Sequence, residues 1–242
     1  MLSDTAQPVK ANAFKTIVDT IVAPKEAFEA IRVAPTWGWA LAITILLAAI
    51  SSFLIVPALQ HAMTVSYPAM IANNPQLAGL TPAQQQMQLG FIEKTLNFSW
   101  IFVVVGVAFL TLVSAAIMTL FNALGSGEGS FGKYWAAAAN ISVPAAGLAA
   151  ILTLVIVMAR GADSFSSMQS IQGAMPSLAL LAPGAGTKLT AFLAGFSPFT
   201  IWAAALNIVA MLTIGRVPRL QAWLAGIVIL VIAPLFALAV TH

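Results

Sequence analysis

The stretch GSGEGSFGKYW, residues 125–135, comes closest in this sequence to a known chemical motif. Gly127, Gly129 and Gly132 have the spacing G-x-G-x-x-G of a turn that binds a dinucleotide pyrophosphate. Gly127 followed by Gly132 and Lys133 comes within one residue of the phosphate loop G-x-x-x-x-G-K-[ST]. Either motif would place a nucleotide phosphate against backbone N–H groups at the start of a helix.

The surroundings of this stretch argue against a nucleotide. A dinucleotide turn follows a β-strand and needs an acidic residue about 20 positions later. Here a long apolar segment precedes the stretch, and no acid lies between Glu128 and Asp163. The phosphate loop needs Ser or Thr after the lysine, and Tyr134 occupies that position. We therefore expect no nucleotide and no other cofactor.

A structural role explains the glycines better. The stretch must reverse the chain between two apolar segments, and glycine permits positive φ angles and close backbone approach. We expect Phe131, Tyr134 and Trp135 to anchor the turn at the lipid headgroups. Lys133 is expected to hold the turn on the cytoplasmic side of the membrane.

The remaining residues offer little catalytic chemistry. The sequence has no cysteine and only two histidines, of which His61 stands in a polar connection. Glu26 and Glu29 are neighbours on a helical face that also carries Lys25 and Arg32, so an ordinary charged face explains them better than a catalytic pair of carboxylates. We expect neither an enzyme nor a metal site.

The composition indicates a membrane protein. Hydrophobic residues make up 60% and charged residues 7% of the 242 residues, whereas a soluble domain is about a quarter charged. The mean hydropathy is +0.96. A soluble chain of this size could not cover its surface with so few charges. The small basic excess, ten Lys and Arg against seven Asp and Glu, indicates topology rather than nucleic-acid binding.

Five segments are apolar enough to cross a bilayer as helices, which takes about 20 residues each. None contains Asp, Glu, Lys or Arg, and one such charge at the centre of a span would cost about 3 kcal/mol. The predicted fold is an all-α integral membrane bundle of five transmembrane helices. A cytoplasmic arm, residues 1–36, precedes the membrane domain, residues 37–242. The predicted spans are residues 38–59, 99–124, 136–159, 197–214 and 220–240.

Basic residues and tryptophans set the expected orientation. With the N-terminus in the cytoplasm and the C-terminus outside, most basic residues lie on the cytoplasmic side, as the positive-inside rule requires. All six tryptophans fall near a span end, where an amphipathic ring prefers the headgroups. The cytoplasmic basic residues are then Lys10, Lys15, Lys25, Arg32, Lys133, Arg216 and Arg219, and the outer ones are Lys94, Arg160 and Lys188.

Both outer connections, residues 60–96 and 160–196, are long and polar. Within the first, Thr81 is a predicted N-cap, Pro82 fits the first helical position and Gln84 completes a capping box. We expect a helix from Pro82 that continues unbroken into the second span.

The arm contains two short amphipathic patterns. In AFKTIVDTIV, one stripe combines Phe14 with the apolar residues three, four, seven and eight positions later. In PKEAFEAI, Ala27, Phe28 and Ile31 make a second stripe. Two alternatives stay open and are compatible: the helices pack on their own bundle, or they lie in the inner membrane interface. The first stripe consists of Phe14, Ile17, Val18, Ile21 and Val22.

Several neutral polar residues lie inside the predicted spans. Hydrogen bonds between helices, worth about 0.6–2 kcal/mol each, are the simpler explanation. The alternative is that they line a polar cavity for a solute between the second, third and fourth spans. The positions of interest are Ser114, Asn140, Ser142 and Asn207.

The stretch GSGEGSFGKYWAAAANISVP, residues 125–144, resembles the signature of the Yip domain family, membrane proteins named for their interaction with Ypt/Rab GTPases. The shared pattern is a glycine-rich turn, an aromatic residue, a basic or polar residue, and then a helix with a proline about a dozen positions on, here Pro144. The arm sequence APKEAFEAIRVAP is similar to a second family pattern. Its matching residues are Pro24, Phe28, Ile31 and Pro35.

The resemblance implies five membrane helices with a cytoplasmic N-terminus. The sequence lacks the Asp-Leu-Tyr-Gly-Pro motif of the eukaryotic members, and its short arm and Ala-rich spans look more like the prokaryotic branch. That branch implies a bacterial cytoplasmic (inner) membrane location. GTPase binding is therefore not carried over to this chain.

Two functions remain open. In the first, the protein is a non-catalytic scaffold or adaptor that presents a cytoplasmic docking face to a protein partner and influences lipid packing or trafficking. In the second, it is a small permease or an accessory subunit of a transporter. Membrane lipid is an expected partner in both, and homo-oligomerisation stays open. The docking and motif residues are Pro24, Phe28, Ile31, Pro35, Gly127, Glu128, Gly129, Phe131, Lys133, Trp135 and Pro144.

Overall fold

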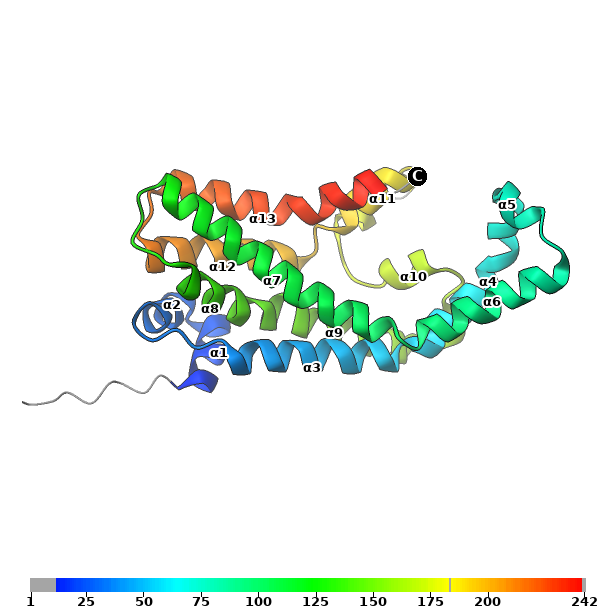
Figure 1. Cartoon of the computed structure of the whole chain (residues 1–242), viewed down its shortest axis with the longest axis horizontal. Coiled ribbons are helices and arrows are strands. Elements are labelled where there is room, and N and C mark those ends of the chain that lie inside the picture. Colours follow the sequence, from blue (N-terminus) through cyan, green and yellow to red (C-terminus); the bar gives the residue numbers. More distant parts are fainter. Residues whose placement is uncertain (1–11, 183, 241–242) are drawn as a thin grey trace, which may run out of the picture.

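The computed structural model describes residues 12–182 and 184–240, which are mainly helical and include no β-strand. Four helical segments are long and apolar enough to cross a membrane, and a bent pair of helices brings the number to five. The prediction of an all-α membrane bundle is therefore confirmed (Figure 1).

The spans follow one another along a bundle in which α13 and α3 form opposite edges and α7 crosses obliquely between them (Figure 1). The third and fourth spans each contain a π-helical segment. The spans are α3 (Gly38–Leu54) with α4 (Val56–Asn73), α7 (Ser99–Leu124), α8 (Phe131–Ser142) with η1 (Val143–Leu148) and α9 (Ala149–Arg160), α12 (Pro198–Ala210) with η4 (Met211–Gly215), and α13 (Arg219–Val240).

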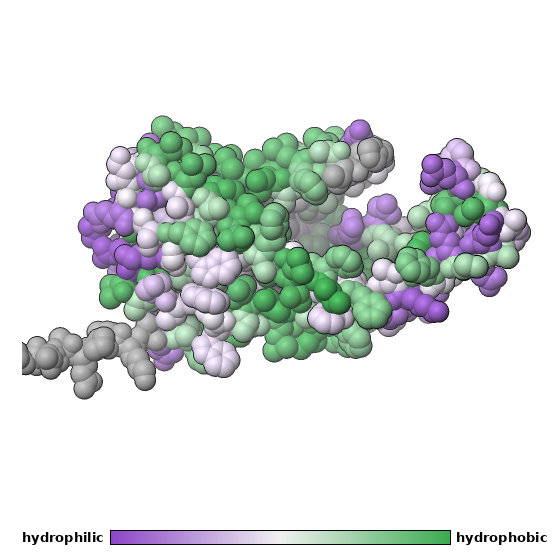
Figure 2. Space-filling view, in the orientation of Figure 1, coloured by the Kyte–Doolittle hydropathy of each residue, from purple (hydrophilic) through white to green (hydrophobic). Residues whose placement is uncertain are grey.

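The outer surface of the bundle is apolar. Figure 2 shows hydrophobic side chains over its middle and hydrophilic ones gathered towards its two ends. In the most apolar windows of α7 and α13, only 17% and 22% of the residues are buried inside the protein. Exposure of such an apolar surface to water would be unfavourable, whereas lipid chains can cover it. The helices satisfy the hydrogen bonds of their own backbone groups, as a bilayer requires.

Prolines account for the main irregularities of the spans. Pro144 lies in the π-helical segment η1, where the wider turn accommodates a residue that has no N–H. Pro198 occupies the first position of α12, and Ser197 and Thr200 form a capping box there. The first span is bent: α3 ends at Leu54, and the axis of α4 makes an angle of 46° with that of α3. Pro57 stands at this bend, where its ring would clash with a continuing helix.

Part of the chain extends beyond one end of the bundle, where α4, α5 and α6 project away from it (Figure 1). Helix α6 (Pro82–Leu96) begins with the predicted capping box of Thr81 and Gln84. The expectation that it continues unbroken into α7 is wrong, because a turn at Asn97 and Phe98 separates the two helices. The short elements here are α5 (Pro75–Ala78), η2 (Ala162–Ser164), α10 (Met168–Gln172), η3 (Leu178–Leu181) and α11 (Thr187–Ala194).

The second helix of the arm, α2 (Pro24–Val33), is part of the bundle core. Ala27, Phe28 and Ile31 are fully buried. They join a cluster that includes Met118 of α7 and Met211 of η4. The arm is therefore docked on the bundle through the stripe predicted for α2.

The first helix of the arm, α1 (Ala13–Val22), shows a different arrangement. Its buried face consists of Thr16, Ile17 and Thr20, and both threonine hydroxyls donate to carbonyls of their own helix. Phe14 and Val18 of the predicted apolar stripe are exposed instead. An exposed apolar face beside the membrane end of the bundle suits a helix in the lipid interface, so the arm combines both alternatives: α2 packs on protein, and α1 also presents an apolar face outwards.

We call the end of the bundle that carries α1, α2, the loop 125–130 and the turn 216–218 the arm end (Figure 1). Cysteine placed at exposed Ser126 of this end is expected to react only with reagents that reach the cytoplasm, because the arm end holds most of the basic residues. Asn74→Cys, at the opposite end, should react from outside. Labelling of Ser126→Cys in intact cells by an impermeant reagent would reverse the orientation.

Candidate functional site

Charged side chains gather at the arm end, where Figure 2 shows a hydrophilic group of residues (left of the view). Three of its elements are helix α2, the loop between α7 and α8, and the turn between η4 and α13. The chain positions these elements through two asparagines, Asn122 and Asn140, which are both buried.

The Asn122 side chain, in the last turn of α7, organises the glycine loop. Its Nδ2 donates to the carbonyl oxygens of Gly127 at 3.2 Å and Gly129 at 3.1 Å. Its Oδ1 accepts from the Gly129 N–H at 3.0 Å and from the Tyr134 hydroxyl at 2.8 Å. One amide side chain thus connects two positions of the loop, Gly127 and Gly129, to Tyr134 in the first turn of α8. Asn122 is not among the predicted site residues, although a polar amide at the end of an apolar span beside glycines is a usable signal.

Close packing, rather than backbone conformation, explains the glycines around Asn122. A Cβ at Gly127 would lie 2.3 Å from Asn122 Oδ1, and one at Gly215 would lie 2.0 Å from the Tyr134 hydroxyl oxygen. At Gly129 a Cβ would lie 2.5 Å from the Tyr134 ring. Close approach, one of the two roles expected for the glycines of the loop, is therefore confirmed for Gly127 and Gly129. The other role, positive φ, is wrong for them, because within the loop the positive φ belongs to Ser126, at 52°.

The aromatic residues of the loop divide into two groups. Phe131 is exposed, as a headgroup anchor should be, and Trp135 contacts Trp37 edge to face with ring centroids 5.9 Å apart. Tyr134 is fully buried instead of lying at the headgroups. Its hydroxyl is held by Asn122, which makes burial of the polar group favourable.

Asn140 holds the link between the arm and the first span. Its Nδ2 donates to the Thr36 carbonyl oxygen at 2.8 Å and to the Ala136 carbonyl oxygen at 2.8 Å. The Thr36 carbonyl directly follows the motif residue Pro35, which is exposed. Asn140 therefore fixes the chain as it leaves α2 and enters α3, and its role is not that of a solute-binding residue in the middle of the membrane.

A groove of about 700 Å³ lies at the arm end between α2 and the segment from α12 to the turn after η4. Four charged side chains of α2 line one side of it. On the other side are the apolar Val209 and Leu212, with Arg216 beyond them. The charged lining residues of α2 are Lys25, Glu26, Glu29 and Arg32.

The structure brings together part of the predicted docking set. Pro24 lines the groove, and Glu128 reaches its edge through an ion pair with Arg216, 3.5 Å between the charged groups. Lys133 and Arg219 belong to the arm end but do not line the groove. Exposed ion pairs such as that of Glu128 with Arg216 contribute little to stability. These charges would therefore matter for the recognition of a partner.

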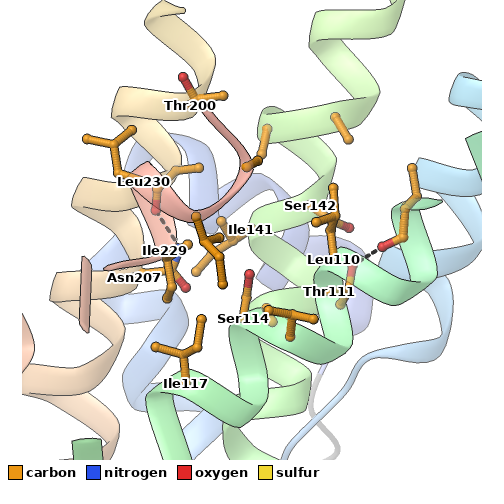
Figure 3. A pocket seen from close by; sticks show the side chains of 18 of the residues that line it. Leu110, Thr111, Ser114, Ile117, Ile141, Ser142, Thr200, Asn207, Ile229 and Leu230 are labelled. Atoms are coloured by element: carbon orange, nitrogen blue, oxygen red, sulfur yellow. Dashed lines mark hydrogen bonds between the residues drawn. The ribbon is translucent and has the colours of Figure 1, made fainter. Parts of the chain in front are cut away.

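The other predicted polar positions lie deeper in the bundle. Ser142 Oγ is 2.9 Å from Thr44 Oγ1 on α3, a hydrogen bond between helices. Ser114 of α7 and Asn207 of α12 line a second cavity, of about 210 Å³, between α7, α8, α12 and α13 (Figure 3). Its lining is mainly aliphatic and contains no charged residue.

The fold and the arm end define a class: helical integral membrane proteins with an amphipathic arm packed on the bundle. A comparison with protein families found that the family model described as Yip1 domain matches residues 18–241, which is nearly the whole chain. The chain belongs to this Yip1 domain family, and the resemblance seen in the sequence is confirmed. No curated protein and no solved structure matched the chain in the other two comparisons.

Proposed function

We propose that the protein is a non-catalytic membrane adaptor whose arm end docks a soluble protein partner in the cytoplasm. The observation that carries this proposal is the groove between α2 and the α12–η4 segment, with its mixed charges and apolar floor. Membership of the Yip1 domain family supports a membrane protein without an enzymatic role. As part of the same proposal, the membrane is the bacterial cytoplasmic membrane.

The hydrophobic core holds the α2 wall of the groove in place. Phe28 and Ile31 anchor α2 from below, and Asn140 fixes the chain just after it. The charged side chains of α2 are therefore presented on a rigid element, so a partner does not have to order them fully on binding. Preorganisation of this kind is typical of a recognition surface rather than of a flexible leader.

The lining of the groove indicates the chemistry of the partner. Lys25 and Arg32 flank Glu26 and Glu29 along α2, so a matching surface must carry both signs of charge. Leu212 offers a partly exposed apolar contact at the floor. We therefore propose a soluble protein segment with an apolar anchor flanked by acidic and basic residues, in which the charges set specificity and encounter rate.

Reversal of one groove charge tests this function. Lys25→Glu is expected to lower recovery of the co-purified partner by on the order of tenfold, because it places like charges together in the complex. Lys188→Glu is the matched control, since both lysines are exposed and Lys188 lies at the opposite end of the bundle. The measurement is quantitative mass spectrometry of proteins recovered with each variant from the same membranes.

The outcome decides whether the arm helps to dock a partner or is a leader that binds none. Loss of the same protein from Lys25→Glu, with full recovery from Lys188→Glu, supports the docking surface. Full recovery of every partner from Lys25→Glu would contradict it.

The cavity of Figure 3 is the observation that favours the second function, a small permease or an accessory subunit of a transporter. It lies between the second, third and fourth spans, as a solute path would require, and the fifth span also lines it. Its aliphatic lining and lack of charge suit an apolar molecule better than an ion or a sugar. The docking function is therefore the better supported one.

A further inference from the structure

The cavity between α7, α8, α12 and α13 contains polar groups that the protein itself leaves unused. Asn207 is 2% exposed, and its Nδ2 donates to the Ala203 carbonyl oxygen. Its Oδ1 is buried and accepts no hydrogen bond. The Ser114 hydroxyl likewise makes no hydrogen bond to the described part of the chain, residues 12–182 and 184–240. A buried acceptor without a partner is destabilising by about 1–3 kcal/mol, so a ligand that donates a hydrogen bond to Asn207 Oδ1 would remove this cost.

The two unused groups face the same space. Figure 3 shows Ser114 on α7 and Asn207 on α12 extending into the cavity from opposing helices. The other hydroxyls of the lining are already occupied: Thr111 donates to the Val107 carbonyl, Ser142 to the Ala139 carbonyl and Thr200 to the Gly195 carbonyl. The site thus offers one strong acceptor and one free hydroxyl within a mainly aliphatic wall.

The cavity reaches the surface of the bundle that lipid covers. Leu110 of α7 and Ile232 of α13, both lining residues, are 49% and 40% exposed. Helices α7 and α13 diverge from the arm end onwards (Figure 1). The cavity is lined by the middle of both helices, from Leu110 to Ile117 of α7 and from Ile229 to Pro234 of α13. A molecule dissolved in the bilayer could therefore enter between them, while a charged solute would have to lose its hydration in an apolar environment.

We propose that this cavity binds the hydroxyl-bearing alkyl chain of a neutral membrane lipid. The ligand hydroxyl donates its proton to Asn207 Oδ1 and accepts from the Ser114 hydroxyl, and the alkyl chain lies against the aliphatic wall towards Leu110 and Ile232. A single hydroxyl satisfies both unused groups. The site is independent of the docking surface at the arm end, and its failure would leave that proposal untouched.

Photolabelling of the purified protein in lipid nanodiscs tests the site. The probe is hexadecanol with a photoreactive diazirine in its chain, and labelled peptides are mapped by mass spectrometry. Decanol is expected to displace the probe from cavity peptides about tenfold more effectively than decyl methyl ether, which cannot donate a hydrogen bond. Leu112 serves as the control position, since its side chain is exposed on the outer surface of the bundle. Labelling at Leu112 should not be saturable.

Two variants assign the selectivity to the cavity. Asn207→Leu keeps the size of the side chain and should reduce the preference for alcohol over ether to about one. Ser114→Ala, a smaller change that serves if Asn207→Leu fails to fold, should reduce the preference in part. Equal displacement by alcohol and ether in the unmodified protein, or an unchanged preference in both variants, would overturn the proposal. So would the absence of saturable labelling in the cavity.

The source of the hydroxyl is distinguished by a second competitor. Dioctanoylglycerol carries a free hydroxyl on a glycerol backbone, whereas decanol carries it on a single chain. Displacement by both indicates a glycerolipid that also tolerates simple alcohols. Displacement by decanol alone indicates a free long-chain alcohol, and both results support the same hydrogen-bonding site.

Discussion

Gly127→Ala should destabilise the protein by about 3 kcal/mol, which combines overpacking with the loss of buried hydrogen bonds. The added Cβ would lie 2.3 Å from Asn122 Oδ1 and 2.8 Å from the Gly215 carbonyl oxygen. Because Gly215 ends η4 and blocks the other side, the loop cannot move away without breaking the Asn122 hydrogen bonds. The measurement is thermal unfolding of the purified protein in detergent, followed by tryptophan fluorescence.

Gly132→Ala is the matched control in the same stretch. No atom lies within 4 Å of a Cβ built at Gly132, and this residue stands in the first turn of α8, where alanine favours the helix by up to about 1 kcal/mol. Stability should therefore stay the same or rise. Equal destabilisation by the two substitutions would contradict the packing role assigned to Gly127.

Phe28→Ala should have the second large effect, a loss of about 3–5 kcal/mol in the free energy of unfolding. Phe28 is fully buried in the core cluster that α2 shares with α7, α8, α12 and η4. The remaining void would loosen α2 and with it one wall of the groove. Thermal unfolding measures the loss of stability, and limited proteolysis of the arm reports the release of α2.

Phe14→Ala removes the same side chain from α1, where it is 57% exposed. Its ring lies 5.5 Å from the Trp39 ring, centroid to centroid, so the expected cost in detergent is about 1 kcal/mol. If both substitutions destabilised the protein equally, α2 would not be the element that docks the arm.

The spans could be predicted because a single local property sets them. A bilayer excludes charged residues from a helix centre, so uncharged apolar segments identify themselves in the sequence. The start of α6 was predictable for a similar reason, since Thr81, Pro82 and Gln84 form a capping box from neighbouring residues alone. Its end at Leu96 was not, because the turn at Asn97 has no comparable local marker.

The orientation of α1 shows where the pattern of apolar residues is insufficient. In water, an apolar stripe such as Phe14, Val18 and Val22 must face protein. Beside a membrane the same stripe can face lipid, and the threonines then pack inwards with their hydroxyls bonded to their own helix. The sequence defines an amphipathic helix, whereas the competition between two apolar environments decides which face is buried.

The packing at the centre of the loop could not be predicted from the neighbouring sequence. Asn122, Gly127 and Gly215 are constrained by one another and by Tyr134, although they come from three separate segments. Only their tertiary approach makes the glycines necessary. The motif spacing could therefore locate the loop but not explain it.

The docking surface is tested most directly by a photoreactive phenylalanine analogue placed at Leu212, on the floor of the groove. In living cells we expect it to crosslink to a protein, and the crosslink should disappear when Lys25→Glu is added. The same analogue at Leu112, on the lipid-facing side of α7, should give no such product. A protein crosslink that is identical at both positions, or that persists unchanged with Lys25→Glu, would contradict the account.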